Sequence, residues 1–388
     1  MLSLQYKGRI RNAKFTSRSI VYVLSDQAAR RFPVLQRVCS FPVEAQLMAD
    51  AAHEAYPLQS AVVNLPAPTC FAELGMPVTA PVRQTHTVYS VQDVTVTGWK
   101  GAMIKDGLLL SDYADCNWAA EIRLRPYFTR VLPDGRAYFN LMTSIPARGH
   151  VFHWLFDSIL PFVAFAESGK AGNDIGLIVN AKLSEIQART IEFLKTRYPI
   201  RAVEPVSEAQ AVFVPHCQKA VAIYGLPHGL QSPAALQALD GLARFLAGAE
   251  AHKKQPARIY ISRNDARLRR VLNEGELLRE LHARGFERTA LGRMPLARQV
   301  ALFINAEFVA APHGAGLTHI AWCKPGTRVA EFFPEPRAGR KVRNYLPDFW
   351  CISSQRGLSH SCHFGAPVET RADGFRIPRE ALAQALGG

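Results

Sequence analysis

The segment from residue 148 to 157, RGHVFHWLFD, places two imidazoles and a carboxylate at helical spacing. In a helix, His150, His153 and Asp157 would share one face, because residues three and four apart are neighbours there. Trp154 would lie on the same face. Polar groups in an otherwise apolar helix are costly unless they are used, and either His153 or Asp157 could take a proton from an attacking hydroxyl. The alternative is a helix N-terminus whose histidines bind nearby backbone groups.

A basic cluster lies in residues 260–274, YISRNDARLRRVLNE. A predicted strand ends at Ser262 and Arg263, and more arginines follow within the next seven residues, namely Arg267, Arg269 and Arg270. Parallel sheets bind their ligands at the carboxyl ends of the strands. Arginine offers a flat pair of donors that suits phosphate oxygens. The position therefore favours a phosphate site over a solvated basic loop.

A third cluster is the small-residue turn PHGAGLT at residues 312–318, between an apolar run and a predicted helix. Backbone N–H groups at such a helix start can bind an anion. One helix-terminus contact contributes about 0.3–1 kcal/mol and a charged hydrogen bond about 1.5–3 kcal/mol, whereas micromolar binding needs about 8 kcal/mol. We therefore expect the turn to bind an anion only together with Arg263 and a second arginine. The candidate residues of the turn are His313, Gly314, Ala315, Gly316, Leu317 and Thr318.

The same turn lacks the marks of two common nucleotide sites. The third glycine of the dinucleotide fingerprint and the Walker lysine are both missing. A metal site is also disfavoured. His150 with His153, and His313 with His319, are the pairs that could ligate a metal, but no further ligand lies at suitable spacing. The paired aspartates of a phosphate-bridging magnesium site are missing as well. We predict no metal.

Strands and helices alternate from Val151 onward, which predicts a parallel sheet with helices on both faces. Asn273 followed by Glu276 predicts a capped helix start. The expected strands cover residues 175–179, 212–215, 258–262, 286–289, 308–311 and 328–331, and the expected helices residues 184–196, 233–246, 273–281, 295–303, 317–322 and 378–386.

The N-terminal half has a different pattern. Residues 88–125 alternate apolar and polar residues, and Asp106-Gly107 between two apolar runs predicts a β-hairpin. Glycine and proline cluster at residues 222–232, and 388 residues suit two domains. We expect an N-terminal domain at 1–225, β-rich at 88–125 and α/β at 150–215, and a C-terminal domain at 226–388 with a terminal helix.

Composition limits the compartment and the partners. The chain is 48% hydrophobic and 20% charged, and its seven cysteines form no CxxC pair, which indicates reduced thiols. We expect a cytoplasmic protein, because the N-terminus lacks a signal-like apolar core and the longest apolar window, 151–166, is interrupted by polar residues. The net charge of +14 would attract nucleic acid, anionic lipid or phosphorylated substrates, although basic residues spread over the surface are an equal alternative.

Taken together, the three clusters resemble the family 61 glycosyltransferases, which include bacterial capsular polysaccharide biosynthesis proteins. The resemblance covers roughly residues 88–332. Its most specific parts are His153-Trp154-Leu155 with Pro161, Tyr260 to Arg263 with Arg269, Arg270, Asn273 and Glu274, and His313 to Thr318 through Pro325-Gly326-Thr327 to Glu331. His150 and His319 depart from the family pattern, in which asparagine is common at both positions.

The resemblance implies a GT-B-like α/β fold, in which two Rossmann-like domains face each other across a cleft. It implies that the C-terminal domain holds a nucleotide-sugar donor and that the sugar's anomeric carbon is inverted without an obligatory metal. Glu331 would then lie near the nucleotide ribose, and His153 and Asp157 on the acceptor side. The expected donor-binding residues are Ser262, Arg263, Arg269, Arg270, Asn273, His313, Gly314, Ala315, Gly316, Leu317, Thr318 and Glu331.

We therefore expect an inverting, metal-independent glycosyltransferase without a cofactor, in which Asp157 or His153 activates the acceptor hydroxyl. Its partners would be a nucleotide-sugar donor, a polysaccharide or lipid-linked glycan acceptor, and the anionic inner face of a membrane, with no nucleic acid. Two alternatives remain, a non-catalytic protein that binds nucleic acid or another polyanion through its positive charge, and a Rossmann-type oxidoreductase, which the missing third glycine disfavours.

Overall fold

The computed structural model describes residues 37–39, 45–58, 61–63, 82–84, 86–98, 101–106, 108–111, 127–142, 151–222, 229–266, 268–334, 348–366 and 374–387. His150 lies outside these described residues. The chain divides into two compact units, and each is described by itself. The first unit contains residues 1–59 and 85–224, and the second contains residues 60–84 and 225–388.

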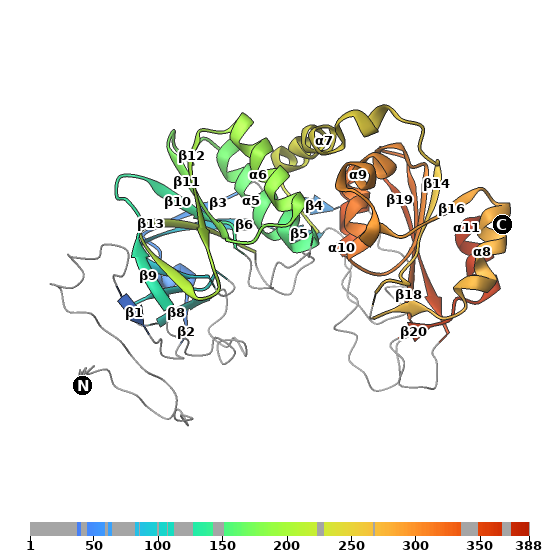
Figure 1. The fold of residues 1–388 in the computed structure, drawn as a ribbon, viewed down its shortest axis with the longest axis horizontal. Helices are drawn as coiled ribbons and strands as arrows, with labels where there is room; N and C mark the ends of the chain where they lie inside the picture. Colours follow the sequence, from blue (N-terminus) through green and yellow to red (C-terminus); the bar gives the residue numbers. More distant parts are fainter. Residues whose placement is uncertain are drawn as a thin grey trace, which may run out of the picture. The chain divides into compact units, whose positions relative to one another are not determined.

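The first unit is built on a mixed sheet of eleven strands (Figure 1). Its strands are β1 (Arg37–Cys39), β2 (Ala45–Leu47), β3 (Glu54–Pro57), β6 (His86–Thr97), β7 (Met103–Lys105), β8 (Leu108–Ser111), β9 (Tyr127–Val131), β10 (Ala137–Asn140), β11 (Ile175–Asn180), β12 (Ile200–Val206) and β13 (Gln210–Ala222). Its helices are α2 (Met48–Ala51), α4 (Val151–His153), the π-helix η2 (Trp154–Ile159), α5 (Leu160–Glu167) and α6 (Glu185–Arg197).

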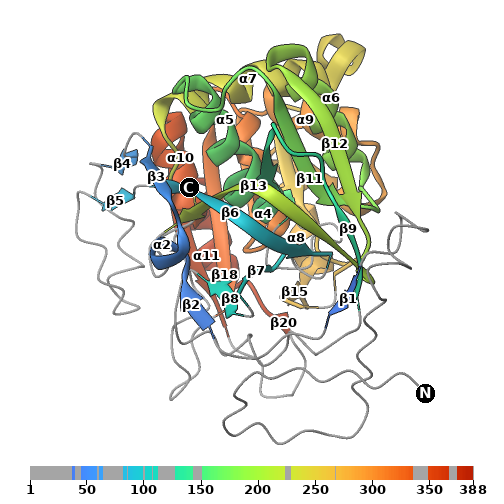
Figure 2. The same ribbon diagram turned by 90° about the vertical axis from the view of Figure 1, so that its left-hand side faces the viewer.

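A parallel βαβαβ arrangement occupies one side of this sheet. β10 pairs with β11 and β11 with β12, all parallel. The helical segment α4–η2–α5 connects β10 to β11, and α6 connects β11 to β12; α5 and α6 lie beside these strands (Figure 2). Phe139 of β10 packs against Phe162 and Phe165 of α5, with ring centroids 5.1 and 5.9 Å away. These contacts pack α5 against β10.

The other side of the sheet is mainly antiparallel. β6 pairs along its length with β13, and β7 pairs with β8. The predicted hairpin is confirmed, because Met103 opposes Leu110 and Lys105 opposes Leu108 around the turn at Asp106. Asp106 has a φ of 50°, the left-handed conformation that such tight turns require. Residues 112–125 of the expected β-rich stretch lie outside the described residues.

The second unit is built on five parallel strands in the order β16-β14-β17-β18-β19. They are β14 (Arg258–Ile261), β16 (Phe286–Thr289), β17 (Phe308–Pro312), β18 (Arg328–Pro334) and β19 (Ser359–Gly365). Two small sheets accompany them, β4 (Ala61–Val63) with β5 (Val82–Gln84), and β15 (Arg270–Val271) with β20 (Gly374–Phe375). The predicted α/β class is thus confirmed for this unit.

Helices cover both faces of the five-stranded sheet (Figure 1). Ala330 and Phe332 of β18 pack in one buried cluster with Leu281 of α8 and Leu382 of α11. Glu331 lies between these two residues on β18, so its side chain points to the opposite face of the sheet. The helices of this unit are α7 (Pro233–Ala247), η3 (Gly248–His252), α8 (Glu274–Ala283), η4 (Leu291–Arg293), α9 (Leu296–Asn305), η5 (Ala315–Trp322), α10 (Asp348–Arg356) and α11 (Arg379–Leu386).

One local prediction was wrong. Asn273 precedes α8 but its side chain makes no capping bond, because its amide bonds the backbone of Ile377 instead. The helix predicted after the small-residue turn is confirmed, and it is a 3₁₀-helix, Ala315–Trp322. Among the described residues, no helix has the length and apolar character needed to cross a membrane, and the cysteines Cys217, Cys323, Cys351 and Cys362 carry free thiols.

Candidate active site

The strand order of the second unit locates the edge at which a ligand should bind. Numbered in chain order, the five strands lie as 2-1-3-4-5, so the connection from β14 to β16 runs in one direction along the sheet and the connection from β16 to β17 runs in the other. Doubly wound sheets of this order bind ligands at the carboxyl ends of the two strands where the direction reverses. Those strands are β14 and β17, which are direct neighbours. Ser262-Arg263 follows the first and His313-Gly314 the second, so two of the predicted clusters meet here.

Arg263 lies directly against the backbone of Gly314. A Cβ atom added to Gly314 would lie 2.1 Å from Nη1 and 2.7 Å from Cζ of Arg263. Gly314 has an extended φ of 161°, which any residue can adopt. Glycine is therefore needed at this position for the close approach of the guanidinium, and the Arg263 cation is held at the turn.

The guanidinium of Arg263 is bound to a carbonyl rather than to an acid. Its Nε and Nη2 donate to the backbone oxygen of Leu268, at 3.3 and 3.0 Å. Burial lowers the pKa of Arg263 from its ordinary value, Arg269 lowers it further, and Asp265 opposes the change. Within the part of the chain that the structure describes, no carboxylate forms an ion pair with Arg263. Its positive charge is therefore available to an anion.

The other two predicted arginines lie on the loop that Arg263 closes. Arg269 has a φ of 57°, a left-handed conformation that costs a non-glycine residue about 1–2 kcal/mol. Arg270 is exposed and begins β15, where it pairs with Gly374. The loop thus places three arginines close in sequence beside the carboxyl end of β14.

Ser262 is buried and belongs to a hydrogen-bonded group that includes Arg288, a residue that the sequence analysis did not identify. Its Oγ donates to Glu274 at 3.1 Å and accepts from Arg288 Nη2 at 2.9 Å and from the N–H of Asn264 at 3.3 Å. Arg288 also donates to Glu274 at 3.2 Å. Ser262 is thus held by its own neighbours. Arg288 lies on β16, next to β14, and the alignment of those two predicted strands could have suggested it.

Asn273 is engaged elsewhere. Its Nδ2 donates to the backbone oxygen of Ile377 at 2.9 Å, and its Oδ1 accepts from the N–H of Ile377 at 3.0 Å. The side chain is buried, and these two bonds hold the C-terminal segment before α11 against the start of α8. Asn273 was expected to bind the donor, and that expectation stays a prediction.

His313 is linked to a buried carboxylate. Its Nδ1 lies 2.5 Å from Oε1 of Glu331, whose Oε2 lies 3.1 Å from Nε2 of His360. Burial raises the pKa of Glu331, but His313 and then His360 outweigh it, and the pKa is lowered overall. The ring of His313 stacks on Phe333, with centroids 4.7 Å apart. Both oxygens of Glu331 thus contact histidines, and the expected ribose contact of Glu331 stays a prediction.

Glu331, His360 and Cys362 are the described residues whose atoms could ligate a metal, since their ligand atoms lie within 4.8 Å of one another. Hydrogen bonds account for this grouping. His360 is bonded to Glu331, and the Sγ of Cys362 lies 4.0 Å from Oε2 of Glu331. His319, which was considered with His313 as a possible metal ligand, accepts a hydrogen bond from Trp322 Nε1 at 3.1 Å.

The rest of the turn packs tightly under the site. A Cβ on Gly316 would meet Leu291 at 3.3 Å and Ile261 at 3.4 Å. Leu317 is buried and donates its N–H to the oxygen of Gly314 at 2.9 Å. The hydroxyl of Thr318 is fully buried and has no hydrogen-bond partner among the described residues. Ala315 begins η5 and remains exposed.

The first unit carries the remaining predicted pair, on a widened helical turn. In η2 the N–H of Leu160 bonds the oxygen of Leu155, five residues earlier. Pro161 follows and has no N–H, so it cannot bond the oxygen of Asp157 as an α-helix would require. Turns of this π type are frequent at functional sites.

His153 and Asp157 form a close pair on this turn. Nδ1 of His153 lies 2.6 Å from Oδ2 of Asp157, and the two side chains are 21% and 24% exposed. Ser158 donates to the oxygen of Leu141 at 2.7 Å, which ties the turn to the carboxyl end of β10. Trp154 is buried and so does not share the exposed face, contrary to the prediction.

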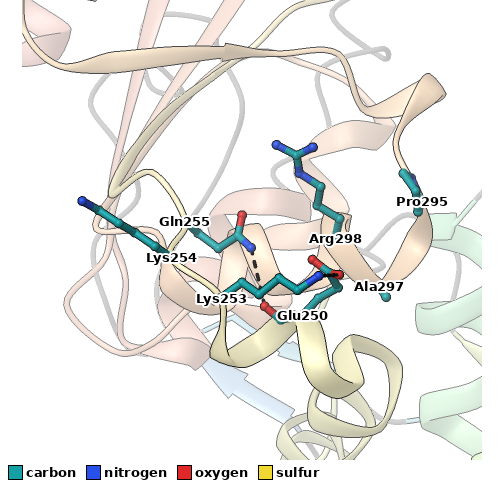
Figure 3. A pocket seen from close by; sticks show the side chains of 7 residues that line it. All are labelled: Glu250, Lys253, Lys254, Gln255, Pro295, Ala297 and Arg298. Carbon is teal, nitrogen blue, oxygen red and sulfur yellow. Dashed lines mark hydrogen bonds and ion pairs between the residues drawn. The ribbon is translucent and has the colours of Figure 1, made fainter.

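A separate hollow of about 460 Å³ lies beside the start of α9 (Figure 3). Lys253 in it is paired with Glu250 at 2.5 Å. Its lining residues are Glu250, Lys253, Lys254, Gln255, Pro295, Ala297 and Arg298, and none of them was predicted as a site residue.

A comparison with known protein families gives a match over the part of the chain that contains these candidate residues. Residues 151–330 match the sequence model of the family described as Glycosyltransferase 61. This segment belongs to the glycosyltransferase 61 family. It begins just before His153 and ends one residue before Glu331, so it includes the His153–Asp157 pair, the arginine loop and the small-residue turn. The predicted family is thereby confirmed, and the protein is a glycosyltransferase that takes a sugar donor and an acceptor. A search of curated proteins found no match.

Proposed function

We propose that this glycosyltransferase is an inverting, metal-independent enzyme of GT-B architecture. The second unit, residues 226–388 in the main, binds a nucleotide-sugar donor, and the first unit, residues 1–225 in the main, supplies the catalytic base. The parallel strands and helices in both units support the assignment of two Rossmann-like domains. The acceptor is a polysaccharide or lipid-linked glycan of a cell-surface pathway, as in the capsular polysaccharide enzymes that the sequence resembles.

One observation carries the donor assignment, the position of Arg263. It lies at the carboxyl edge between β14 and β17, packs on the backbone of Gly314, and pairs with no acid in the described part of the chain. A charge-assisted bond to a phosphate contributes about 1.5–3 kcal/mol. Arg270 and the backbone of residues 314–316 add further donors. Together they can neutralise the diphosphate as it leaves, which is the task of a metal in other transferases.

The His153–Asp157 pair supports base catalysis. A carboxylate bound to Nδ1 holds the imidazole in the tautomer whose Nε2 can accept a proton. In the proposed reaction, the acceptor oxygen forms a bond to the anomeric carbon while the bond from that carbon to the phosphate oxygen breaks. The acceptor proton moves to Nε2 of His153, and the nucleoside diphosphate leaves with its negative charge. Asp157 thus orients the base and stabilises the imidazolium.

Membrane association is a separate part of the proposal. The net charge of +14 supports peripheral binding to anionic lipid at the inner membrane face. Sedimentation with vesicles that contain acidic lipid should show binding that weakens as salt is raised. Binding that salt does not weaken would contradict an electrostatic association.

A ligand screen tests the donor assignment. Thermal-shift measurements with UDP-, GDP-, CMP- and dTDP-linked sugars should identify one nucleotide that stabilises the wild-type protein and not Arg263→Ala. Arg279→Ala is the matched control, since Arg279 is an exposed arginine of α8 in the same unit. Equal stabilisation of both variants would refute the role of Arg263. Stabilisation by nucleic acid or by NAD alone would favour the other functions considered.

A further inference from the structure

We infer that His360 and Ser353 are positioning residues, which fix the ring of His313 at the donor site through the carboxylate of Glu331. The inference rests on the proposed donor site. It adds two residues from β19 and α10 that lie outside the segment matched to the family.

The four side chains form a continuous row of hydrogen bonds across the second unit. Ser353 Oγ lies 2.7 Å from Nδ1 of His360, whose Nε2 lies 3.1 Å from Oε2 of Glu331. Oε1 of Glu331 then lies 2.5 Å from Nδ1 of His313. Each residue comes from a different element, α10, β19, β18 and the turn after β17. A shift of α10 or β19 would therefore change the position of His313 at the turn.

Burial makes this row rigid. The side chains of Glu331 and His360 are 1% and 2% exposed, and Ser353 is fully buried. Water cannot replace a lost partner easily in such a place, so each broken bond leaves a costly unpaired group. The strand pairing supports the arrangement, since Glu331 lies opposite Cys362 and His360 opposite Val329 in the parallel β18–β19 pair.

The charge of Glu331 decides the direction of every bond. Each oxygen of Glu331 lies within hydrogen-bond distance of an imidazole nitrogen, and an ionised carboxylate can only accept such bonds. His313 must therefore donate from Nδ1 and His360 from Nε2. The Nδ1 atom of neutral His360 is then an acceptor, and the hydroxyl of Ser353 supplies its hydrogen. Glu331 thus selects the Nε2–H form of His360, and the hydroxyl of Ser353 completes the hydrogen bonding of that form.

The consequence concerns the second nitrogen of His313. With its Nδ1–H directed to Glu331, and its ring stacked on Phe333 and edge-on to Phe349, the imidazole has one orientation. Its Nε2 then faces away from Glu331. In this Nδ1–H form Nε2 carries no hydrogen, so at the turn beside Arg263 it can accept a hydrogen bond from a hydroxyl group of the nucleotide-sugar. The row therefore positions a donor-binding group without touching the donor.

Two variants of His360 test the inference. His360→Leu removes the N–H group that donates a hydrogen bond to Glu331. In His360→Gln, the side-chain amide nitrogen can donate that hydrogen bond instead of Nε2–H. We expect His360→Leu to raise KM for the nucleotide-sugar at least about tenfold with a smaller change in kcat, and His360→Gln to restore most of the loss. Ser353→Ala should give an intermediate effect. His363→Gln is the matched control, because His363 lies on the same strand and bonds Ser361 rather than Glu331.

A spectroscopic measurement keeps the test independent of turnover. Nitrogen-15 NMR of the imidazoles should show His313 as the Nδ1–H form in the wild-type protein and a mixture of tautomers in His360→Leu. An unchanged His313 tautomer in a folded His360→Leu protein would overturn the inference even if the donor site is right. An altered tautomer without any nucleotide-sugar turnover would instead count against the proposed function alone.

Metal analysis provides a second way to overturn it. If the purified protein contained one equivalent of a divalent metal that Cys362→Ser removed, His360 Nε2 would carry a metal and could not donate to Glu331. A metal-free protein with full activity is the expected result. Melting temperatures of all variants would show whether a loss of activity reflects unfolding. If His360→Leu does not fold, the tautomer of His313 in Ser353→Ala and His360→Gln still tests the inference.

Discussion

The guanidinium of Arg263 occupies the space that a side chain at position 314 would need, with Nη1 only 2.1 Å from the Cβ position of Gly314. The two residues follow neighbouring parallel strands, β14 and β17. This contact explains why residue 314 is glycine, although its extended backbone conformation is open to any residue. It also gives the first of four predictions.

Gly314→Ala should displace Arg263 and abolish donor binding while the protein remains folded. The backbone at this position is extended, so alanine adds no local strain. Isothermal titration with the nucleotide identified in the screen would measure the loss. Gly275→Ala is the control, since no atom lies within 4 Å of the Cβ position there; an alanine within α8 should be neutral or stabilise by about 1 kcal/mol. Unchanged affinity in Gly314→Ala would contradict the proposed contact.

His153→Gln and Asp157→Asn should both reduce kcat, by about 100-fold or more, because the base is removed or loses its orientation. Donor affinity should stay close to that of the wild-type protein. Initial rates at saturating donor, with acceptor varied, would separate the two quantities. His252→Gln, at an exposed histidine of η3, serves as the control. If Asp157→Asn retained full activity, Asp157 would neither orient His153 nor act as the base.

Asn273→Ala should destabilise the protein by about 1–3 kcal/mol, since both amide atoms are bonded to the backbone of Ile377. Denaturant unfolding would give the free energy of unfolding, and KM for the donor should not change. The opposite result, a higher KM with normal stability, would support the expected donor contact of Asn273.

Acid should destabilise the protein through His319. Burial lowers the pKa of His319 to about 4, from an ordinary value of 6.5. Between these values the unfolded chain binds a proton that the folded protein does not, so the free energy of unfolding falls as pH falls, by at most about 1.4 kcal/mol per pH unit. His319→Gln should lose less stability than the wild-type protein between pH 7 and pH 5 in urea unfolding. His282→Gln, at an exposed histidine of α8, should not differ from the wild-type protein.

Much of the second unit could be predicted from the sequence, because its strands are short apolar runs between clear helical patterns. The strand Phe286–Thr289 was predicted with its observed bounds, and the predicted end of β14 places Ser262-Arg263 where the structure has it. His360 could not be found in this way. Its strand, SHSCHFG, is polar and lacks the apolar pattern of a buried strand, since hydrogen bonds rather than apolar contacts fill that side of it.

The partner of Asn273 shows a second limit of the sequence. A capping pattern is local, but the amide of Asn273 bonds a residue more than one hundred positions away. Likewise the π-type turn at His153 depends on how Pro161 is accommodated, and its widening is not visible in spacing alone. In both cases tertiary contacts override the structure that the local sequence favours, and both cases involve candidate site residues.

The division of the chain has a practical consequence. Residues 60–84 group with the second unit although they precede most of the first, so the chain passes from one unit to the other three times, after residues 59, 84 and 224. A single cut near residue 225 would separate the second unit from β4 and β5, and β4 contacts α10, the helix that carries Ser353. A fragment starting at residue 225 would therefore be an incomplete module, and the donor-binding half is best studied within the whole chain.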